Sequence, residues 1–314
     1  MNSDILVSVC VVTYNQEKYI AECLESVINQ KTNFAFEIIV GEDCSTDNTR
    51  AIVQQYVDKY PDLIKPIFHK KNIGTVENIK MVYAAAKGKY ISHIDGDDLT
   101  LPDKLQKQFN ALESNFDCIM CTHDMELSDE YNNRYKRSFS SNRKNVNSLF
   151  DLYEKLPFFA HSSKTFVNNI TNDFWNNFSN ETTDIELHVK QAKKGKIFHI
   201  NEKLGVYRQS TGISTKNSKV NILLSNATRR IFEEALIDNS NDYEKINNYY
   251  AKSLFNYAYQ SAIYGDKVGL SSYINESISI SVFSKKQLIF YKMSRNPALV
   301  IKICRLRYYL GKFI

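Results

Sequence analysis

The sequence YISHIDGDD, at residues 90–98, joins a short apolar segment to three carboxylates within four positions. A strand that ends in this way aims several negative charges at one place. Carboxylates that lie so close together raise one another's pKa unless a cation neutralises them. Mg²⁺ and Mn²⁺ prefer oxygen ligands, and such a cation suits a phosphate-bearing substrate. The segment therefore predicts a buried strand that ends at a divalent-metal site.

Apolar, β-branched segments alternate with helical patterns on both sides of this strand. Strands are expected near residues 5–12, 36–40, 64–68, 90–94 and 118–122, with helices between them. Two further short strands are expected at residues 197–200 and 204–207. Repeated strand–helix–strand units imply a largely parallel sheet with helices on both faces. Ligands of such sheets bind at the carboxyl ends of the strands. Polar residues suited to a nucleotide follow these ends at residues 13–15, 42–45, 71–74 and 95–98.

Composition limits the class of protein. The chain has 314 residues, is 43% hydrophobic and carries a formal net charge of +5, which does not favour a nucleic-acid partner. Six scattered cysteines without a disulfide pattern favour a reducing cytoplasm. The first residues lack the basic region of a signal peptide, and no apolar run approaches the roughly 20 residues that span a bilayer. We expect a cytoplasmic protein with one domain over residues 1–215 and a helical region over residues 216–314.

In this order, the motifs resemble the family 2 glycosyltransferases with a GT-A fold, of the bacterial cell-surface polysaccharide type. The matching segments are Thr13-Tyr14-Asn15, Glu42-Asp43-Cys44-Ser45-Thr46-Asp47, Asn72-Ile73-Gly74, Asp95-Gly96-Asp97-Asp98, Thr183-Asp184 and Val206-Tyr207-Arg208. The resemblance covers residues 5–215 and implies a Rossmann-like, mostly parallel central sheet with helices on both faces. It also implies an inverting, metal-dependent transfer of a sugar from a nucleotide-diphosphate sugar, expected to be a UDP-sugar. The acceptor would be a hydroxyl of a glycan or lipid-linked glycan.

The resemblance assigns roles to the matching residues. The implied donor-binding set is Thr13, Tyr14, Asn15, Glu42, Asp43, Ser45, Asn72, Asp95, Gly96 and Arg208. Within it, Asp43 would bond to the base and Arg208 would help neutralise the diphosphate. Asp97 would bind Mn²⁺ or Mg²⁺, which stabilises the leaving diphosphate as a Lewis acid. Asp184 would be the general base, and such a base contributes about 10²–10⁴-fold to the rate.

Two positions depart from the family's pattern, and several residues allow other interpretations. Ser210 stands where members often have a histidine, and Thr183 stands where the base motif usually has Glu. Asp184 could instead cap the helix that follows it, and Glu186 is a rival base. Asp98 is expected to be a local structural residue.

Other functions remain open from the sequence alone. A sugar nucleotidyltransferase would also use acidic metal ligands. Such an enzyme is expected to have a glycine-rich loop after the first strand, and residues 13–17 contain no glycine. A catalytically inactive carbohydrate- or membrane-binding module of the same fold is a further alternative. A zinc site could be formed by Cys118, Cys121 and His123. The apolar strand pattern around them favours buried cysteines without a metal. His161 falls where members often have acceptor-side residues.

The C-terminal end predicts a basic amphipathic helix. No acidic residue follows Glu276, whereas eight lysines and arginines do. Pro297 can begin a helix on which Leu299, Ile303 and Leu306 share a face with Leu310. Such a helix would either bind an anionic membrane surface or pack on the protein with its basic face in water. The first alternative would give a peripheral contact with the inner face of the cell membrane. The oligomeric state is left open.

Overall fold

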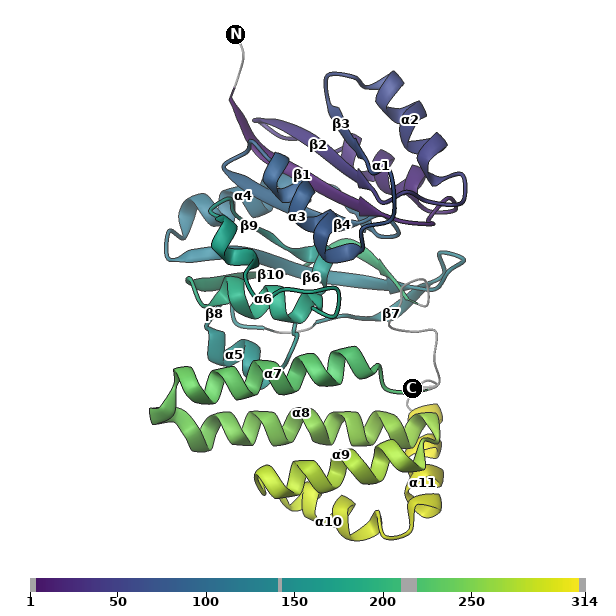
Figure 1. Ribbon diagram of the computed structural model, residues 1–314, viewed down its shortest axis with the longest axis vertical. Coiled ribbons are helices and arrows are strands. Elements are labelled where there is room, and N and C mark those ends of the chain that lie inside the picture. The colour runs from purple at the N-terminus through teal and green to yellow at the C-terminus, as the bar shows by residue number, and fades with distance from the viewer. Residues whose placement is uncertain (1–3, 141–142, 210–218, 311–314) are drawn as a thin grey trace. The chain divides into compact units, whose positions relative to one another are not determined.

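The computed structural model describes residues 4–140, 143–209 and 219–310, and its chain forms two compact units (Figure 1). The first comprises residues 1–149 and 158–211, and the second comprises residues 150–157 and 212–314. The short segment 150–157 groups with the C-terminal helices although it lies far from them in the sequence. Ser210 and the boundary expected near residue 215 lie outside the described residues, so the division into residues 1–215 and 216–314 stays a prediction.

A mixed sheet forms the centre of the first unit. Its strands are β1 (Ile5–Thr13), β2 (Ala35–Glu42), β3 (Ile64–Phe68), β4 (Tyr90–Asp95), β5 (Leu99–Thr100), β6 (Cys118–Ser128), β7 (Arg134–Ser138), β8 (Val146–Asn147), β9 (Thr165–Val167) and β10 (Lys196–Arg208). Their order is β3-β2-β1-β4-β9-β6-β10-β5, with β7 paired to β6 and β8 paired to β10. The helices of the first unit are α1 (Ile20–Ile28), α2 (Thr49–Lys59), α3 (Thr75–Ala85), α4 (Lys104–Ser114) and α6 (Asp184–Ala192), with short 3₁₀ turns η1 (His161–Ser163) and η2 (Asn172–Trp175).

The register of the parallel strands brings the predicted polar residues to one edge. Strand β1 lies between β2 and β4 and is parallel to both, with Thr13 opposite Glu42 and Val12 opposite Asp95. The longest pairings, including β6 with β10, are parallel, whereas the short strands β5, β7, β8 and β9 pair antiparallel. The strand-end arrangement expected from the sequence is therefore present.

One detail of the sequence-based strand assignment is wrong. Two short strands were expected at residues 197–200 and 204–207, but β10 is continuous from Lys196 to Arg208. The exposed residues between them occupy irregular positions in the ladder, where the register against β6 shifts on either side of Lys203. Such a bulge interrupts the apolar pattern without ending the strand.

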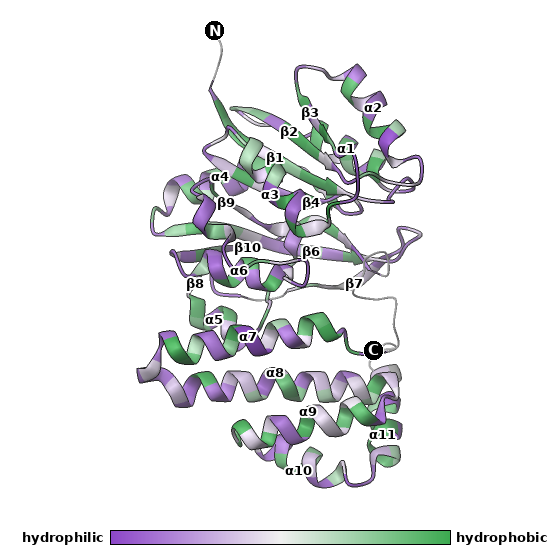
Figure 2. Ribbon diagram, in the orientation of Figure 1, coloured by the Kyte–Doolittle hydropathy of each residue, from purple (hydrophilic) through white to green (hydrophobic). Residues whose placement is uncertain are grey.

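Successive side chains of β1 point to opposite faces of the sheet, and apolar side chains on both faces explain why helices cover both. Val7, Val9 and Val11 belong to a buried apolar cluster with residues of α1, α2 and α4. Cys10 points to the opposite face, where its Sγ lies 3.7 Å from the carbonyl oxygen of Val82 in α3. Figure 2 shows β1 and β2 coloured mainly as hydrophobic between these helices. Burying each such aliphatic side chain contributes roughly 1.5–3 kcal/mol.

The second unit is helical. It contains most of α5 (Leu149–Glu154), then α7 (Ile222–Asp238), η3 (Ser240–Asp242), α8 (Tyr243–Tyr264), α9 (Lys267–Ile280), α10 (Lys285–Met293) and α11 (Pro297–Leu310). The rings of Phe232 and Tyr250 stack at 5.1 Å, and Tyr153 packs on Phe232 at 5.7 Å. Arg229 binds both carboxylate oxygens of Glu276 at 2.7 Å. In the part of the chain that the structure describes, no helix is long and apolar enough to cross a membrane.

Candidate active site

The DGDD segment forms a tight turn that is fitted against the end of β1. The Gly96 amide donates to the carbonyl of Val12 at 2.9 Å. A Cβ added at Gly96 would lie 2.6 Å from Gln16 Oε1 and 2.9 Å from Thr13 Cβ, so no larger residue fits without movement. Asp98 anchors the other side of the turn, since its Oδ1 accepts the backbone amide of Arg208 at 2.9 Å. The turn is therefore held between β1 and β10.

The loop after β1 and the loop after β2 are fastened to each other by side-chain contacts. Asn15 adopts a left-handed conformation, φ 52°, and its Oδ1 accepts the Thr46 amide at 2.8 Å. The Asn15 amide in turn donates to Ser45 Oγ at 3.0 Å. Thr13, which is almost fully buried, donates from Oγ1 to Gln16 Oε1 at 2.8 Å. Tyr14 is exposed and extends from this pair of loops.

Asp43 and Glu42 organise the neighbouring loop. The two carboxylate oxygens of Asp43 accept the amides of Ile73 and Gly74 at 2.7 and 3.0 Å. Asn72 donates from Nδ2 to the Asp43 carbonyl at 3.3 Å. Glu42 is fully buried, accepts the Ser45 amide at 2.6 Å and forms an ion pair with Arg50. Both carboxylates therefore shape the strand-end loops that the sequence assigned to the donor.

Asp95 is connected to the interior through Ser162 and His93. The Asp95 amide donates to Ser162 Oγ at 3.0 Å, and Ser162 Oγ donates to Asp95 Oδ2 at 3.2 Å. His93 Nε2 lies 3.2 Å from Asp95 Oδ1. On its other side, His93 Nδ1 lies 3.0 Å from the hydroxyl of Tyr83. These contacts fix the orientation of the carboxylate at the end of β4.

Asp184 begins α6, but it is not the cap of that helix. Thr183 occupies the N-cap position and forms a capping box with Glu186, whose Oε2 accepts the Thr183 amide at 2.8 Å. The capping box gives a reason for Thr183 at the position where the base motif usually has Glu. Because the Glu186 carboxylate is bonded to the backbone at the start of the helix, Glu186 is a poorer candidate for the base than Asp184. Asp184 is half-buried, and burial followed by the charge of Asp95 raises its pKa to about 6, with Lys164 opposing the shift.

Three buried histidines, His93, His161 and His188, lie between Asp95 and Asp184. His161 Nδ1 lies 2.9 Å from His188 Nε2, and the rings of His93 and His161 are 3.9 Å apart. Burial lowers the pKa of all three histidines, so they are neutral near pH 7. Burial also lowers the pKa of Lys164 to about 7 and that of Lys104 to about 8. His161 was noted in the sequence, but no pattern there indicated the roles of His93, His188 or the two lysines.

The carboxylates of the DGDD turn fit a divalent cation. Asp98 Oδ2 is buried and accepts no hydrogen bond. Burial, and then the charges of Asp97 and Asp95, raise the pKa of Asp98 well above its usual range. Uncompensated negative charge of this kind is what a cation bound by Asp97 would offset.

Two other groups of possible ligands occur among the described residues. They are His93, Asp95 and His161, and His161, Asp184 and His188, with ligand atoms within 4.8 Å of one another. His161 and His188 already bond to each other, and the charge of Lys164 acts on both. We therefore assign no metal to them. Neither group contains Cys118 or Cys121, which are buried in β6.

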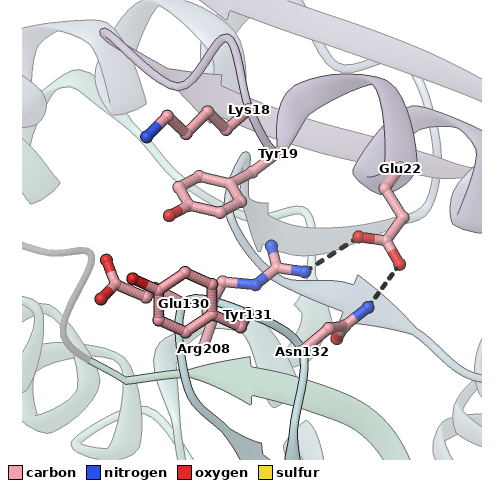
Figure 3. Close-up of a pocket in the computed structure, with 7 residues that line it drawn as sticks. All are labelled: Lys18, Tyr19, Glu22, Glu130, Tyr131, Asn132 and Arg208. Atoms are coloured by element: carbon pink, nitrogen blue, oxygen red, sulfur yellow. Dashed lines mark hydrogen bonds and ion pairs between the residues drawn. The ribbon is translucent and has the colours of Figure 1, made fainter.

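A pocket of about 270 Å³ lies beside Arg208 (Figure 3). Its lining residues are Lys18, Tyr19, Glu22, Glu130, Tyr131, Asn132 and Arg208. Arg208 comes from the end of β10, forms an ion pair with Glu22 at 2.9 Å, and lies over the Tyr19 ring at 4.5 Å. Its guanidinium also donates to the carbonyl of Asp97. The pocket thus places a cation beside the proposed metal ligand.

Comparisons with known proteins agree with this geometry. A model of the family described as "Glycosyl transferase family 2" matches residues 8–175, which is more than half of the chain. The chain belongs to glycosyl transferase family 2. Over 141 residues it is 37% identical to the putative glycosyltransferase EpsE of Bacillus subtilis, a match that covers 45% of this chain and 50% of EpsE. The chain spans half or less of the length of the curated relatives that it matches.

Solved structures establish the fold. The Staphylococcus aureus TarS 1–349 structure in complex with UDP-GlcNAc aligns with a TM-score of 0.63 and 18% identity, over 98% of this chain and 92% of the TarS 1–349 chain. The mannosyltransferase PcManGT from Pyrobaculum calidifontis, in complex with GDP-Man and Mn²⁺, aligns with a TM-score of 0.55 and 14% identity, over 97% of this chain and 88% of its own. The α/β fold of this family 2 member is therefore GT-A, followed by a helical C-terminal region.

Proposed function

We propose that this protein is an inverting, metal-dependent glycosyltransferase that moves a sugar from a nucleotide-diphosphate sugar to a hydroxyl of a glycan or lipid-linked glycan. The observation that carries the proposal is that two carboxylate sites, the DGDD turn and Asp184, lie close to each other. His161 lies close to both, since a ring nitrogen of His161 lies within 4.8 Å of a carboxylate oxygen of Asp95 and a ring nitrogen also lies within 4.8 Å of a carboxylate oxygen of Asp184. Donor and acceptor chemistry can therefore meet at one place.

The loops at the ends of β1 and β2 bind the nucleotide-sugar donor in this proposal. Thr13, Tyr14, Asn15 and Ser45 line the nucleoside position. Asp43 holds Ile73 and Gly74 beside it, and we propose that the same loop receives the base. These loops are already fastened to each other by hydrogen bonds, so little ordering is needed when the nucleotide binds.

Asp97 is the proposed ligand of Mn²⁺ or Mg²⁺. The bound cation would stabilise negative charge on the departing diphosphate. Arg208 adds a second positive charge at the same position, because its guanidinium is fixed by Asp97 and Glu22. The UDP-GlcNAc bound by TarS favours a UDP-sugar for this chain, while the GDP-Man of PcManGT keeps a GDP-sugar as the alternative.

The acceptor half depends on Asp184. A hydroxyl is a poor nucleophile, and a carboxylate on the face opposite the leaving group can take its proton as the new bond forms. A base with a pKa of about 6 is ionised at pH 7 yet binds a proton far more readily than an ordinary aspartate does. Attack from that face inverts the anomeric carbon.

The exposed face of α11 supports contact with a membrane that carries the acceptor. Val300, Ile301 and Cys304 are buried, whereas Leu299, Ile303 and Leu306 are 43–60% exposed. Three of the four apolar residues expected to share a face are therefore exposed, and Lys302 and other basic residues flank them. We propose that this stripe binds an anionic lipid surface. Equal binding of the full chain and a Leu299→Ser/Ile303→Ser/Leu306→Ser variant to anionic vesicles would contradict this.

The enzyme assay measures release of nucleoside diphosphate from UDP-GlcNAc, other UDP-sugars and GDP-mannose with Mn²⁺. Wild-type protein should release UDP or GDP from at least one donor, and EDTA should stop the release. Asp97→Ala and Asp184→Ala should each abolish turnover. The Asp97 variant should also lose the Mn²⁺-dependent part of thermal stabilisation by UDP, which the Asp184 variant should keep. Turnover that survives both substitutions would refute the residue assignments.

A further inference from the structure

The pocket beside Arg208 is lined mostly by residues outside the proposed donor-binding set (Figure 3). Lys18 and Tyr19 precede α1, Glu22 lies in its first turn, and residues 130–132 belong to the loop between β6 and β7. Among the described residues that line the pocket, only Arg208 belongs to the donor-binding set. Its volume of about 270 Å³ is near the lower end for small-ligand sites, roughly 300–1,000 Å³. The pocket therefore suits a single ring better than a whole nucleotide-sugar.

The charges that line the pocket balance one another. Lys18 and Arg208 are cationic, whereas Glu22 and Glu130 are anionic. Arg208 is paired with Glu22, but within the described part of the chain the side chains of Lys18 and Glu130 form no hydrogen bond or ion pair. A diphosphate placed here would meet two carboxylates. A neutral ligand with several hydroxyl groups can instead accept a hydrogen bond from Lys18 and donate one to Glu130.

Tyr131 presents an exposed aromatic ring on a well-anchored loop. It is 78% exposed, which is unusual for a large aromatic residue. Asp129 Oδ1 accepts the amides of Tyr131 and Asn133 at 3.0 and 2.9 Å, and Asn132 donates to Glu22 in α1 at 2.9 Å. A tyrosine side chain offers a large contact area and loses little conformational entropy when a ligand covers it. The loop therefore holds the ring at the pocket before any ligand binds.

We propose that this pocket is a subsite for one neutral sugar ring, with the C–H face of the sugar packed on Tyr131 and its hydroxyl groups bonded to Glu130 and Lys18. Aromatic rings provide the apolar contact that such a face needs, and the charged groups provide strong hydrogen-bond partners. The ring belongs either to the donor sugar or to the glycan acceptor, because both have this chemistry. The inference rests on the proposed function, since it takes the reaction to be sugar transfer.

Binding of simple glycosides tests the subsite without catalysis. The methyl glycosides of glucose, galactose, mannose and N-acetylglucosamine are titrated without nucleotide and followed by saturation-transfer NMR. At least one of them should bind the wild type. Its affinity should fall about fivefold or more in Tyr131→Ala and recover in Tyr131→Phe, which keeps the ring. The proposal is overturned if no glycoside binds the wild type, or if Tyr131→Ala binds as tightly as the wild type does.

Phe116 provides the matched control. It is 88% exposed and lies before β6, whereas Tyr131 lies after this strand. The 11 residues of β6, at about 3.3 Å each, separate the two ends by roughly 36 Å. Phe116→Ala should leave glycoside binding unchanged. An equal loss of binding in Phe116→Ala would mean that the glycosides contact exposed aromatic residues without specificity, and would overturn the subsite.

Donor affinities separate the two sources of the sugar ring. Isothermal titrations with Mn²⁺ compare UDP with UDP-GlcNAc, and GDP with GDP-mannose, in the wild type and in Tyr131→Ala. A loss of nucleotide-sugar affinity alone assigns the pocket to the donor sugar. Unchanged nucleotide and nucleotide-sugar affinities, together with lost glycoside binding, assign it to the acceptor. A loss of affinity for UDP or GDP itself would place the diphosphate in the pocket and overturn the proposal.

Turnover separates this inference from the proposed function. If glycoside binding depends on Tyr131 but no nucleotide-sugar is turned over, the proposed function fails and the sugar subsite remains. If nucleoside diphosphate is released by the wild type but Tyr131→Ala leaves glycoside binding unchanged, only the subsite fails.

Discussion

Two regions of the same sheet edge differ in how well their polar groups are paired. At the ends of β1 and β2, the side chains of Asn15, Glu42 and Asp43 bond to the backbone of neighbouring loops. Between β4 and α6, buried atoms of Asp98, His161 and His188 lack partners. Burial also shifts the pKa of these residues and of Asp184. Paired groups make a rigid binding surface, whereas buried and unpaired titratable groups are typical of sites that carry out chemistry.

This difference predicts opposite effects of substitution. Changes in the paired region should lower stability and nucleotide affinity together. Changes in the buried titratable region should lower turnover while leaving stability intact or higher, because that region keeps charges in an unfavourable environment.

Asp184→Asn should have the largest effect. Turnover should fall by about 10²–10⁴-fold, because the proposed general base is lost. The folded state raises the pKa of Asp184 from 3.8 to about 6, so its ionised form costs stability above pH 6 and not below pH 4. Asn carries no charge and removes this cost. The free energy of unfolding of the variant should therefore exceed that of the wild type by about 1–3 kcal/mol at pH 7 and equal it at pH 4. Denaturant titrations at both pH values test this, and a loss of stability at pH 7 would contradict it.

Asp43→Ala tests the paired region. It removes two hydrogen bonds from backbone amides to a carboxylate, each of which contributes about 1.5–3 kcal/mol. The loop at Ile73 and Gly74 should become mobile, and both the stability of the protein and its affinity for UDP should fall. Isothermal titration with UDP and Mn²⁺, together with thermal melting, measures the two effects. Normal stability with weakened UDP binding would show that Asp43 acts on the nucleotide alone.

Gly96→Ala should have an intermediate effect on stability. The added methyl group would press on Gln16 and on Thr13, and such overpacking costs about 1–3 kcal/mol. The turn should shift away from β1, so metal-dependent turnover should fall with stability. Gln16→Ala combined with Gly96→Ala relieves one of the two contacts and should recover part of the loss. No recovery would place the strain at Thr13.

Asn132→Ala should have the smallest effect. The Asn132 side chain donates to Glu22 Oε1 at 2.9 Å and ties the loop between β6 and β7 to α1 beside the pocket (Figure 3). One exposed hydrogen bond of this kind contributes about 0.5–1.5 kcal/mol. Stability should hardly change, while the Michaelis constant for donor or acceptor rises a few-fold. A change in both stability and maximal rate would mean that the loop supports more than the pocket.

Sequence patterns predicted well where the parallel strands end, because the change from apolar to polar residues along the chain determines these positions. The alternation of strands and helices implied the parallel sheet, and the carboxyl ends of parallel strands meet at one edge whatever the details of packing. The cluster of carboxylates after β4 was visible for the same reason. The pattern failed at β10, where exposed residues in a bulge looked like the end of a strand.

Only the tertiary structure decided what each polar residue touches. Thr183 rather than Asp184 caps α6. Asp43 accepts the amides of Ile73 and Gly74, which lie 30 and 31 residues further along the chain. The pairing of Lys164 with β4 and α6, and the contact of His161 with His188, join segments that are separate in sequence. A sequence shows which side chains can be charged, whereas burial and neighbours set the pKa at which they are. The residues proposed for the reaction could therefore be predicted from the sequence, but the contacts and burial that set their pKa values could not.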